Sequence, residues 1–196
     1  MPVNGSVPDV AEKRKNWNGL ISGFRASDLV FLDESGCNTD MTRRYAYSLG
    51  GSRAVDSAPL SKPKNTTILS SIQLDGTLRY TTFSGGTTVE RFKRYLETDL
   101  LPHLNGNSVL IMDNMKSHHA KAVRNLLDSS EIRHIYLPPY SPDVNPIEKL
   151  WSKVKSFLRK FKARTLDALP NAIQNAFHSI TVSDCSGWFR FCGYAL

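Results

Sequence analysis

The sequence has few cysteines and no long apolar run, and these two features exclude several classes of protein. Its three cysteines, Cys37, Cys185 and Cys192, are an odd number with no pair two residues apart, which argues against a disulfide framework and a zinc ribbon. No uninterrupted apolar stretch approaches the roughly 20 residues that cross a bilayer, and Met1 to Leu20 lacks the apolar segment of a signal peptide. We therefore expect reduced thiols, no membrane segment and an intracellular protein.

Composition and charge indicate one globular domain with a basic bias. The 196 residues include 25 Lys and Arg against 18 Asp and Glu, a formal net charge of +7 with neutral His. Hydrophobic residues make up 40% and charged residues 22%, which excludes a disordered or collagen-like chain. Residues 1–28 contain prolines and glycines but no sustained apolar period, so we interpret them as an N-terminal arm or linker that precedes a domain at 29–196.

Two continuous apolar runs predict the centre of this domain. Residues 29–32 (LVFL) end in Asp33, and residues 109–112 (VLIM) end in Asp113. Strands that are apolar at every position are covered on both faces, so they belong in the middle of a sheet flanked by helices. We expect these two strands to be neighbours.

The remaining patterns complete an α/β arrangement. Alternating apolar residues on either side of Asp75-Gly76 predict a hairpin over 67–83. A short strand is expected at 132–137, and helices are expected after a cap at Thr87, after a cap at Ser117, from Asn145 to Phe161, and over 165–180. This order predicts a mixed five-stranded sheet flanked by helices, an arrangement that resembles the ribonuclease H-like fold, with a polar, basic insertion at about 37–65.

Acidic residues stand where the predicted strands end. If the two strands are parallel, Asp33 and Asp113 emerge at the same edge of the sheet. Two carboxylates about 4 Å apart repel each other by about 4 kcal/mol at an effective dielectric near 20, so both stay ionised only with a cation between them. Mg²⁺ suits this position because it takes oxygen ligands and keeps some water. Strand-end aspartates also commonly start turns, which is the alternative interpretation.

Glu148 is the candidate for a third carboxylate. It lies in the first turn of the helix that follows the proline-rich segment 138–146. Glu148 also stands three residues after Asn145, which is the position of a purely structural capping box.

Three sequence blocks contain these acids in order along the chain. They are FLDESG at 31–36, IMDN at 111–114 and YLPPYSPDVNPIEKLW at 136–151, with 34 residues between Asp113 and Glu148. Together the blocks resemble the catalytic domain of DDE transposases, specifically the bacterial insertion-sequence branch of the mariner-like superfamily. The resemblance implies that Asp33, Asp113 and Glu148 are catalytic residues that bind two Mg²⁺ ions, for which Mn²⁺ can substitute.

Residues beside the first two acids are rivals or auxiliaries. Glu34 competes with Asp33, but side chains alternate along a strand, so only one of the two can meet Asp113, and the resemblance favours Asp33. Asn114, His118 and His119 follow Asp113 as auxiliary candidates. One of the two histidines either contacts the scissile phosphate or the leaving oxygen, or is only a polar residue at a helix start.

Basic residues are concentrated after Glu148. Seven of them, with no acid, occur over 149–164: Lys149, Lys153, Lys155, Arg159, Lys160, Lys162 and Arg164. At about 100° per residue, Lys155 and Arg159 fall on the same side of the helix as Glu148. With Arg43 and Arg44 of the insertion, these residues are candidates for DNA phosphate contacts without sequence selectivity. A charge run can also be only a solvated face.

The resemblance implies an enzyme of DNA transposition. It would cut DNA at the ends of an insertion sequence with water, then join the freed 3′ hydroxyl to target DNA, with a preference for TA. The implied partners are double-stranded DNA, an upstream helix-turn-helix region or separate chain for end recognition, and a second copy in a homodimer, in the bacterial cytoplasm without a membrane. The alternatives are a catalytically silent DNA-binding remnant or regulator, and a ribonuclease H-like nuclease that only hydrolyses.

Overall fold

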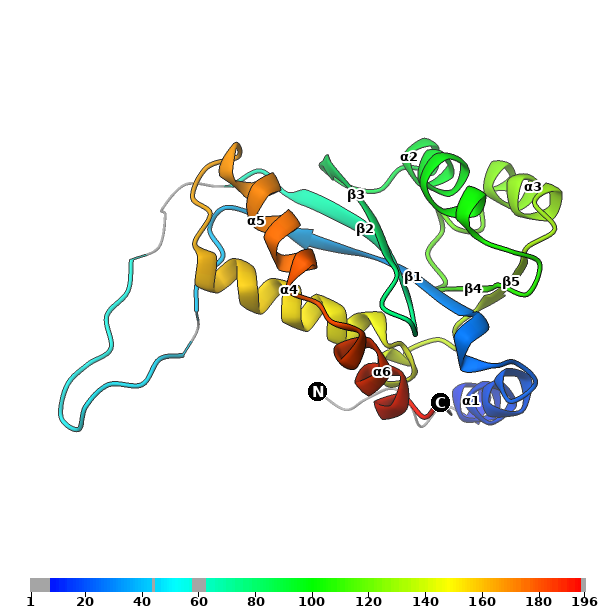
Figure 1. The fold of residues 1–196 in the computed structure, drawn as a ribbon, viewed down its shortest axis with the longest axis horizontal. Coiled ribbons are helices and arrows are strands. Elements are labelled where there is room, and N and C mark those ends of the chain that lie inside the picture. Colours follow the sequence, from blue (N-terminus) through cyan, green and yellow to red (C-terminus); the bar gives the residue numbers. More distant parts are fainter. Residues whose placement is uncertain (1–7, 44, 58–62, 195–196) are drawn as a thin grey trace.

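The computed structural model describes residues 8–43, 45–57 and 63–194 (Figure 1). The strands are β1 (Leu29–Cys37), β2 (Thr66–Gln73), β3 (Leu78–Ser84), β4 (Val109–Met112) and β5 (Arg133–Tyr136). The α-helices are α1 (Pro8–Ile21), α2 (Val89–Tyr95), α3 (Lys121–Ser129), α4 (Ile147–Phe161), α5 (Ala168–His178) and α6 (Val182–Phe191). Short helical turns are η1 (Ala26–Asp28), η2 (Leu96–Leu100, a π-helix), η3 (Leu101–His103) and η4 (Pro142–Val144).

The strands form one mixed sheet in the order β3-β2-β1-β4-β5. β1 pairs antiparallel with β2 and parallel with β4, and β4 pairs parallel with β5. β2 and β3 form the predicted hairpin. The expected five-stranded mixed sheet and the neighbouring positions of the two apolar strands are therefore confirmed.

Helices cover both faces of this sheet. Figure 1 shows α2 and α3 on one side and α4, α5 and α6 on the other. Alternate residues of β1 belong to two separate cores, with Leu29 and Phe31 on the α4 side and Val30 and Leu32 on the α2 side. All four are at most 1% exposed, as expected for a strand that is apolar at every position.

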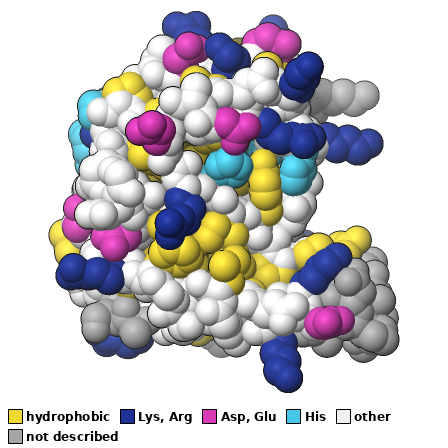
Figure 2. All heavy atoms as spheres, turned by 90° about the vertical axis from the view of Figure 1, so that its right-hand side faces the viewer, with side chains coloured by type: hydrophobic (Ala, Val, Ile, Leu, Met, Phe, Trp, Pro, Cys, Tyr) yellow, Lys and Arg dark blue, Asp and Glu magenta, His cyan; other side chains and the backbone are white. Residues whose placement is uncertain are grey.

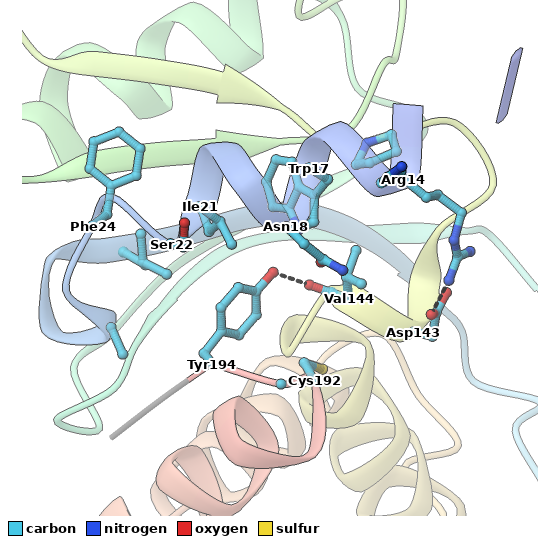
Figure 3. A pocket seen from close by; sticks show the side chains of 15 residues that line it. Arg14, Trp17, Asn18, Ile21, Ser22, Phe24, Asp143, Val144, Cys192 and Tyr194 are labelled. Atoms are coloured by element: carbon cyan, nitrogen blue, oxygen red, sulfur yellow. Dashed lines mark hydrogen bonds and ion pairs between the residues drawn. The ribbon is translucent and has the colours of Figure 1, made fainter. Parts of the chain in front are cut away.

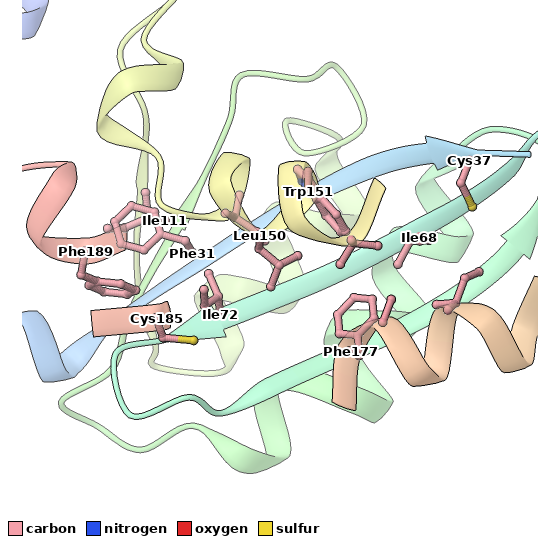
Figure 4. Packing of buried hydrophobic residues seen from close by; sticks show 14 of the residues in the cluster. Phe31, Cys37, Ile68, Ile72, Ile111, Leu150, Trp151, Phe177, Cys185 and Phe189 are labelled. Carbon is pink, nitrogen blue, oxygen red and sulfur yellow. The ribbon is translucent and has the colours of Figure 1, made fainter. Parts of the chain in front are cut away.

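The core on the α4 side is closed by aromatic packing. The ring of Phe31 meets that of Phe189 edge-on, with ring centroids 5.4 Å apart, and lies 5.1 Å from the Tyr194 ring. Figure 4 shows Phe31 and Phe189 together, with Leu150 and Trp151 of α4 over β1 and β2. The helix that contains Glu148 is therefore held directly on the central strands.

Several element boundaries differ from the sequence expectation. β1 continues past Asp33 to Cys37 because residues 34–37 pair with β2, so Asp33 lies within the strand rather than at its end. The cap of α2 is Thr88 and not Thr87, and its side chain accepts from the N–H of Arg91. Ser117 does not cap α3, which begins at Lys121 after a turn over 116–119.

The C-terminal region contains one more helix than expected. α5 ends at His178, and α6 starts with a capping box in which the Thr181 side chain and Asp184 bond each other's backbone N–H groups. Gly187 within α6 weakens its helical sequence signal. Phe161, the last residue of the helix expected from Asn145, is 46% exposed in the last turn of α4.

Residues 8–21, within the segment interpreted as an arm or linker, form helix α1. Trp17 is 4% exposed and belongs to the same core cluster as Leu29 and Tyr194. Leu20 on the same helix is half exposed, so the apolar stripe is too short to stand out as a helical period. The domain division at residue 28 stays a prediction. Within the described ranges, no helix has the length and apolarity needed to span a bilayer.

Replacing Phe189 tests the aromatic core. Phe189→Ala should lower the free energy of unfolding by about 3–5 kcal/mol, because the fully buried ring leaves a cavity between α6 and β1. The matched control is Phe191→Ala, two residues along the same helix and 68% exposed, which should cost less than about 1 kcal/mol. Urea unfolding of both variants measures the difference, and equal losses would contradict this packing.

Candidate active site

Asp33, Asp113 and Glu148 line a single cavity of about 420 Å³. They come from three elements: the middle of β1, the end of β4 and the first turn of α4. The pairing of Leu32 with Met112 brings the first two residues to the same level of adjacent parallel strands. The segment 137–142, which connects β5 toward α4, forms much of the remaining wall.

Asp33 is the most buried acid of this cavity. It is 9% exposed, its Oδ1 accepts the N–H of Glu34 at 2.8 Å, and its Oδ2 accepts the indole N–H of Trp151 at 3.0 Å. Burial raises the pKa of Asp33 to about 7, and nearby Asp113 and Glu34 add to this rise against the two hydrogen bonds. A cation in the cavity would stabilise the charge that burial disfavours.

Asp113 is a half-buried carboxylate that is paired with His118. Its Oδ1 accepts the N–H of Met115 at 3.0 Å and lies 2.9 Å from Nδ1 of His118. Burial alone would raise the pKa of Asp113, but the bonds from His118 and Met115 outweigh burial and hold the pKa below its usual value. Asp113 is therefore ionised at neutral pH, beside an Asp33 that titrates there.

Glu34 reaches Asp113 through His118. Its side chain points to the other face of β1 from Asp33, as alternation requires, yet its Oε1 lies 3.2 Å from His118 Nε2. The nearest ligand atoms of Glu34, Asp113 and His118 all lie within 4.8 Å of one another. Burial lowers the pKa of His118, but the two carboxylates raise it to about 9. His118 has no exposed surface, so its partners in this structure are carboxylates rather than a phosphate.

Two functional contacts were missed by sequence reasoning. The Trp151 bond to Asp33 could have been sought because Trp151 follows Glu148 by three residues on one helix. The Glu34–His118 contact joins residues 84 positions apart, and only a glutamate directly after Asp33 and a histidine five residues after Asp113 point to it.

Glu148 is exposed and does not form the capping box that was its structural alternative. Asn145 accepts the N–H of Glu148 through its main-chain oxygen at 3.2 Å, while its side-chain Oδ1 is buried without a hydrogen-bond partner. Asn145 lines the same cavity as Glu148. The cavity is thus lined by three residues with carboxylate oxygens, the ligand type that fits Mg²⁺. The Glu34, Asp113 and His118 group includes a nitrogen donor and fits Mg²⁺ less well.

Helix α1 and the C-terminal region both form contacts with the segment that precedes Glu148. Arg14 forms an ion pair with Asp143, and the hydroxyl of Tyr194 donates to the main-chain oxygen of Val144 at 2.5 Å (Figure 3). These contacts border a second cavity, of about 740 Å³, between α1 and residues 192–194. The segment that leads into α4 is therefore fixed by contacts with residues that do not line the acidic cavity.

Asn114 and His119, two of the auxiliary candidates, lie at the ends of β4 and β5. The Asn114 side chain donates to the main-chain oxygen of Leu137, and its Oδ1 lies 3.3 Å from Nε2 of His119. The His119 ring stacks on Tyr136, with centroids 4.1 Å apart. Figure 2, which views the side of α1 and α3, shows histidine side chains among acidic and basic ones.

The basic residues of α4 divide between two cavities on its outer surface. Lys149, Lys153 and Lys160 line a groove of about 510 Å³ between α4 and α6. In this groove Lys153 forms an ion pair with Asp184, and Lys149 lies over the ring of Phe191. Arg159, Lys160 and Arg43 of the insertion line a neighbouring cavity of about 470 Å³ that has no acidic residue.

The insertion is attached to the end of α4. The Arg164 guanidinium donates to the main-chain oxygens of Thr39 and Met41 at one end of the insertion and Ser57 at the other. Lys162 forms an ion pair with Asp56 at 2.6 Å. Between these points the ribbon extends away from the sheet (Figure 1). Arg44 lies outside the described residues, and Lys155 is half-buried near the thiol of Cys37, whose pKa burial raises to about 11.

A family described as DDE superfamily endonuclease matches residues 28–170. The Tc1 transposase of Caenorhabditis elegans is 29% identical over 97 residues, which are 47% of this chain and 36% of that protein. The chain therefore spans about a third of the length of this curated relative.

Solved structures of Mos1 transposase share the fold. A pre-cleavage Mos1 transpososome superposes with a TM-score of 0.79 at 20% identity, covering 93% of this chain and 59% of that one. A Mos1 paired-end complex with Mn gives 0.76 at 20% identity, covering 97% and 61%. The Mos1 catalytic domain gives 0.65 at 15% identity, covering 92% and 86%. The expected ribonuclease H-like fold is thereby confirmed.

The burial of Asp33 makes stability depend on pH in the metal-free protein. Its folded-state pKa of about 7 exceeds the ordinary 3.8, so the folded protein binds an extra proton between these values. The free energy of unfolding should therefore fall, by up to about 4 kcal/mol, as pH rises from about 4 to 7. Asp33→Asn should remove this component and gain stability over the wild type at pH 8.

Denaturant unfolding in a chelator at several pH values measures this difference. Asp128→Asn, an exposed aspartate of α3, is the matched control and should follow the wild-type profile. If Asp33→Asn and wild type keep a constant difference in unfolding free energy from pH 4 to 8, the burial assigned to Asp33 is wrong.

Proposed function

The chain belongs to the DDE superfamily of endonucleases, and from this premise we propose that it is the catalytic domain of a Tc1/mariner-type DNA transposase of the bacterial insertion-sequence branch. The convergence of Asp33, Asp113 and Glu148 on one cavity is the observation that supports this proposal most directly. The proposed reaction cuts a DNA phosphodiester with water and then joins the freed 3′ hydroxyl to target DNA, at TA sites.

Asp33, Asp113 and Glu148 would hold two Mg²⁺ ions, with Mn²⁺ able to substitute. The position of three carboxylate residues around one cavity supports this assignment, because Mg²⁺ prefers oxygen ligands. A raised pKa at Asp33 beside an ionised Asp113 is also the electrostatic situation that a divalent ion relieves. When bound, such ions activate water and stabilise the entering and leaving oxygens of an in-line displacement.

The side chains around the acids orient them for this chemistry. Trp151 fixes one oxygen of Asp33, and the N–H of Met115 fixes one oxygen of Asp113. The contacts of Arg14 and Tyr194 hold the segment that precedes Glu148. Rigid positioning matters because phosphoryl transfer depends mainly on placement and electrostatic stabilisation. Asn114, which lines the cavity, and His119, which contacts Asn114, remain auxiliary candidates.

DNA is the proposed partner of the basic surface. Lys149, Lys153, Lys155, Arg159, Lys160, Lys162, Arg43 and Arg44 are proposed to contact DNA phosphates. Support comes from the acid-free cavity of Arg43, Arg159 and Lys160, where a phosphate would meet only cations. We also propose that an upstream helix-turn-helix region or separate chain recognises the element ends. The protein would form a homodimer and would be located on DNA in the bacterial cytoplasm.

Replacement of Asp113 tests the enzymatic proposal. The chain, incubated with DNA that carries the element's terminal repeats and Mg²⁺ or Mn²⁺, should nick and join strands only with metal. Asp113→Asn should lower both rates at least about 100-fold, because the ionised acid that would bind the ion is lost. Asp128→Asn should match the wild type. Gel electrophoresis of labelled strands separates nicked from joined products.

The other outcomes of this assay identify the alternative functions. Binding without nicking would indicate the silent DNA-binding remnant or regulator. Hydrolysis without joining would indicate a nuclease that only hydrolyses, and nicking that persists in Asp113→Asn would contradict the assigned cavity.

The double variant Arg159→Ala/Lys160→Ala tests the DNA-binding surface. Loss of two phosphate contacts should weaken DNA binding equally for different sequences and reduce the slope of log affinity against log salt by about 2. Fluorescence anisotropy at several salt concentrations measures both effects. Lys93→Ala, on α2 and paired with Glu97, is the control. An unchanged salt slope would exclude these two residues from the contact.

A further inference from the structure

We propose that Glu34 and His118 are positioning residues that fix the Asp113 carboxylate for divalent metal binding. The two side chains form a buried bridge between the two central strands. Because the bridge would serve metal binding by Asp113, this inference rests on the proposed function. Neither residue would touch DNA or metal. The bridge would act through Asp113, by setting which oxygen and which orientation the carboxylate presents to the cavity.

One imidazole ring connects two carboxylates. Nδ1 of His118 lies 2.9 Å from Oδ1 of Asp113, and Nε2 lies 3.2 Å from Oε1 of Glu34. The His118 side chain is 0% exposed and that of Glu34 is 7% exposed, so water does not compete for these contacts. Glu34 lies on β1 and Asp113 directly follows β4, so the ring ties together the strands that bear the catalytic acids.

The geometry of the three groups shows what the bridge does. An imidazole has two ring nitrogens, and here each of them faces a carboxylate oxygen. Glu34 holds the ring at Nε2, so that Nδ1 is fixed against the Asp113 carboxylate.

Packing holds the bridge in one place. The His118 ring stacks on Phe92 of α2, with centroids 4.1 Å apart, and the hydroxyl of Tyr136 donates to the main-chain oxygen of His118 at 3.2 Å. The ring and the N–H of Met115 both bond Oδ1 of Asp113. Among the described residues, none donates to Oδ2, which leaves that oxygen for an ion in the cavity.

The same three residues could be taken for a metal site, since their nearest ligand atoms lie within 4.8 Å of one another. However, both nitrogens of His118 already face carboxylate oxygens at hydrogen-bond distance. A metal ion bonded to either nitrogen would take the place of the carboxylate contact of that nitrogen. The bridge therefore differs from a ligand set in a measurable way: the ion binds Asp113 without bonding a ring nitrogen of His118.

Metal affinity is the first test. Isothermal titration of the metal-free chain with Mn²⁺ should give a dissociation constant that rises about 10–100-fold in Glu34→Gln and in His118→Gln, as for other groups that orient metal ligands. His134→Gln, a partly buried histidine on β5, is the matched control and should bind Mn²⁺ as the wild type does. Circular dichroism melting checks that each variant folds.

The outcomes separate this inference from the proposed function. If the wild type binds Mn²⁺ no better than Asp113→Asn does, the metal site itself is wrong. If Asp113→Asn loses binding while Glu34→Gln and His118→Gln bind as tightly as the wild type, only the bridge is wrong. Nicking gives a further check: the Mn²⁺ concentration for half-maximal rate should rise about 10–100-fold in Glu34→Gln, with the rate recovered at saturating metal.

A structure of the wild-type chain with Mn²⁺ tests the bridge without any variant. Crystals grown with Mn²⁺ should show the ion bound to Asp113, while the His118 ring keeps its contacts with Asp113 and Glu34. An ion bonded to a ring nitrogen of His118 would overturn the bridge, even if His118→Gln and Glu34→Gln fail to fold.

Discussion

The parallel pairing of β1 with β4 is the constraint on which the acidic cavity depends. Because Leu32 pairs with Met112, the next residues, Asp33 and Asp113, lie at the same level of the sheet. The pairing rests on residues that are buried on both faces, so a shift in register would move apolar side chains out of two cores at once. The repulsion between the two carboxylates is thus imposed by the same packing that stabilises the sheet.

Much of this arrangement could be predicted from the sequence because the strongest signals are local. Continuous apolar runs identified the two central strands, and the turn at Asp75-Gly76 identified the hairpin. The proline-rich segment before Glu148 located the start of α4 to within one residue. The acids follow directly from these elements, so their convergence needed only the assumption that the two strands are parallel neighbours.

The groups that could not be predicted depend on long-range contacts. The bond from Trp151 to Asp33 joins residues 118 apart, and the helical spacing of Trp151 from Glu148 indicates a shared helix face but not the contact with β1. His118 looked like a polar helix start, but the turn that precedes α3 buries its ring against Phe92 of α2. Helix α1 has one buried aromatic, Trp17, and its core cluster includes Tyr194 near the other end of the chain. In each case tertiary packing outweighs weak local preference.

The attachment of the insertion has a consequence for how this protein tolerates change in length. A single guanidinium, that of Arg164, bonds main-chain oxygens on both sides of the base of the insertion. Arg164 therefore holds the two ends of the insertion close together where the extended part begins. Lengthening a loop whose ends are already held together costs little additional conformational entropy. Related chains could vary widely in the reach of this segment while the sheet and its acids stay unchanged.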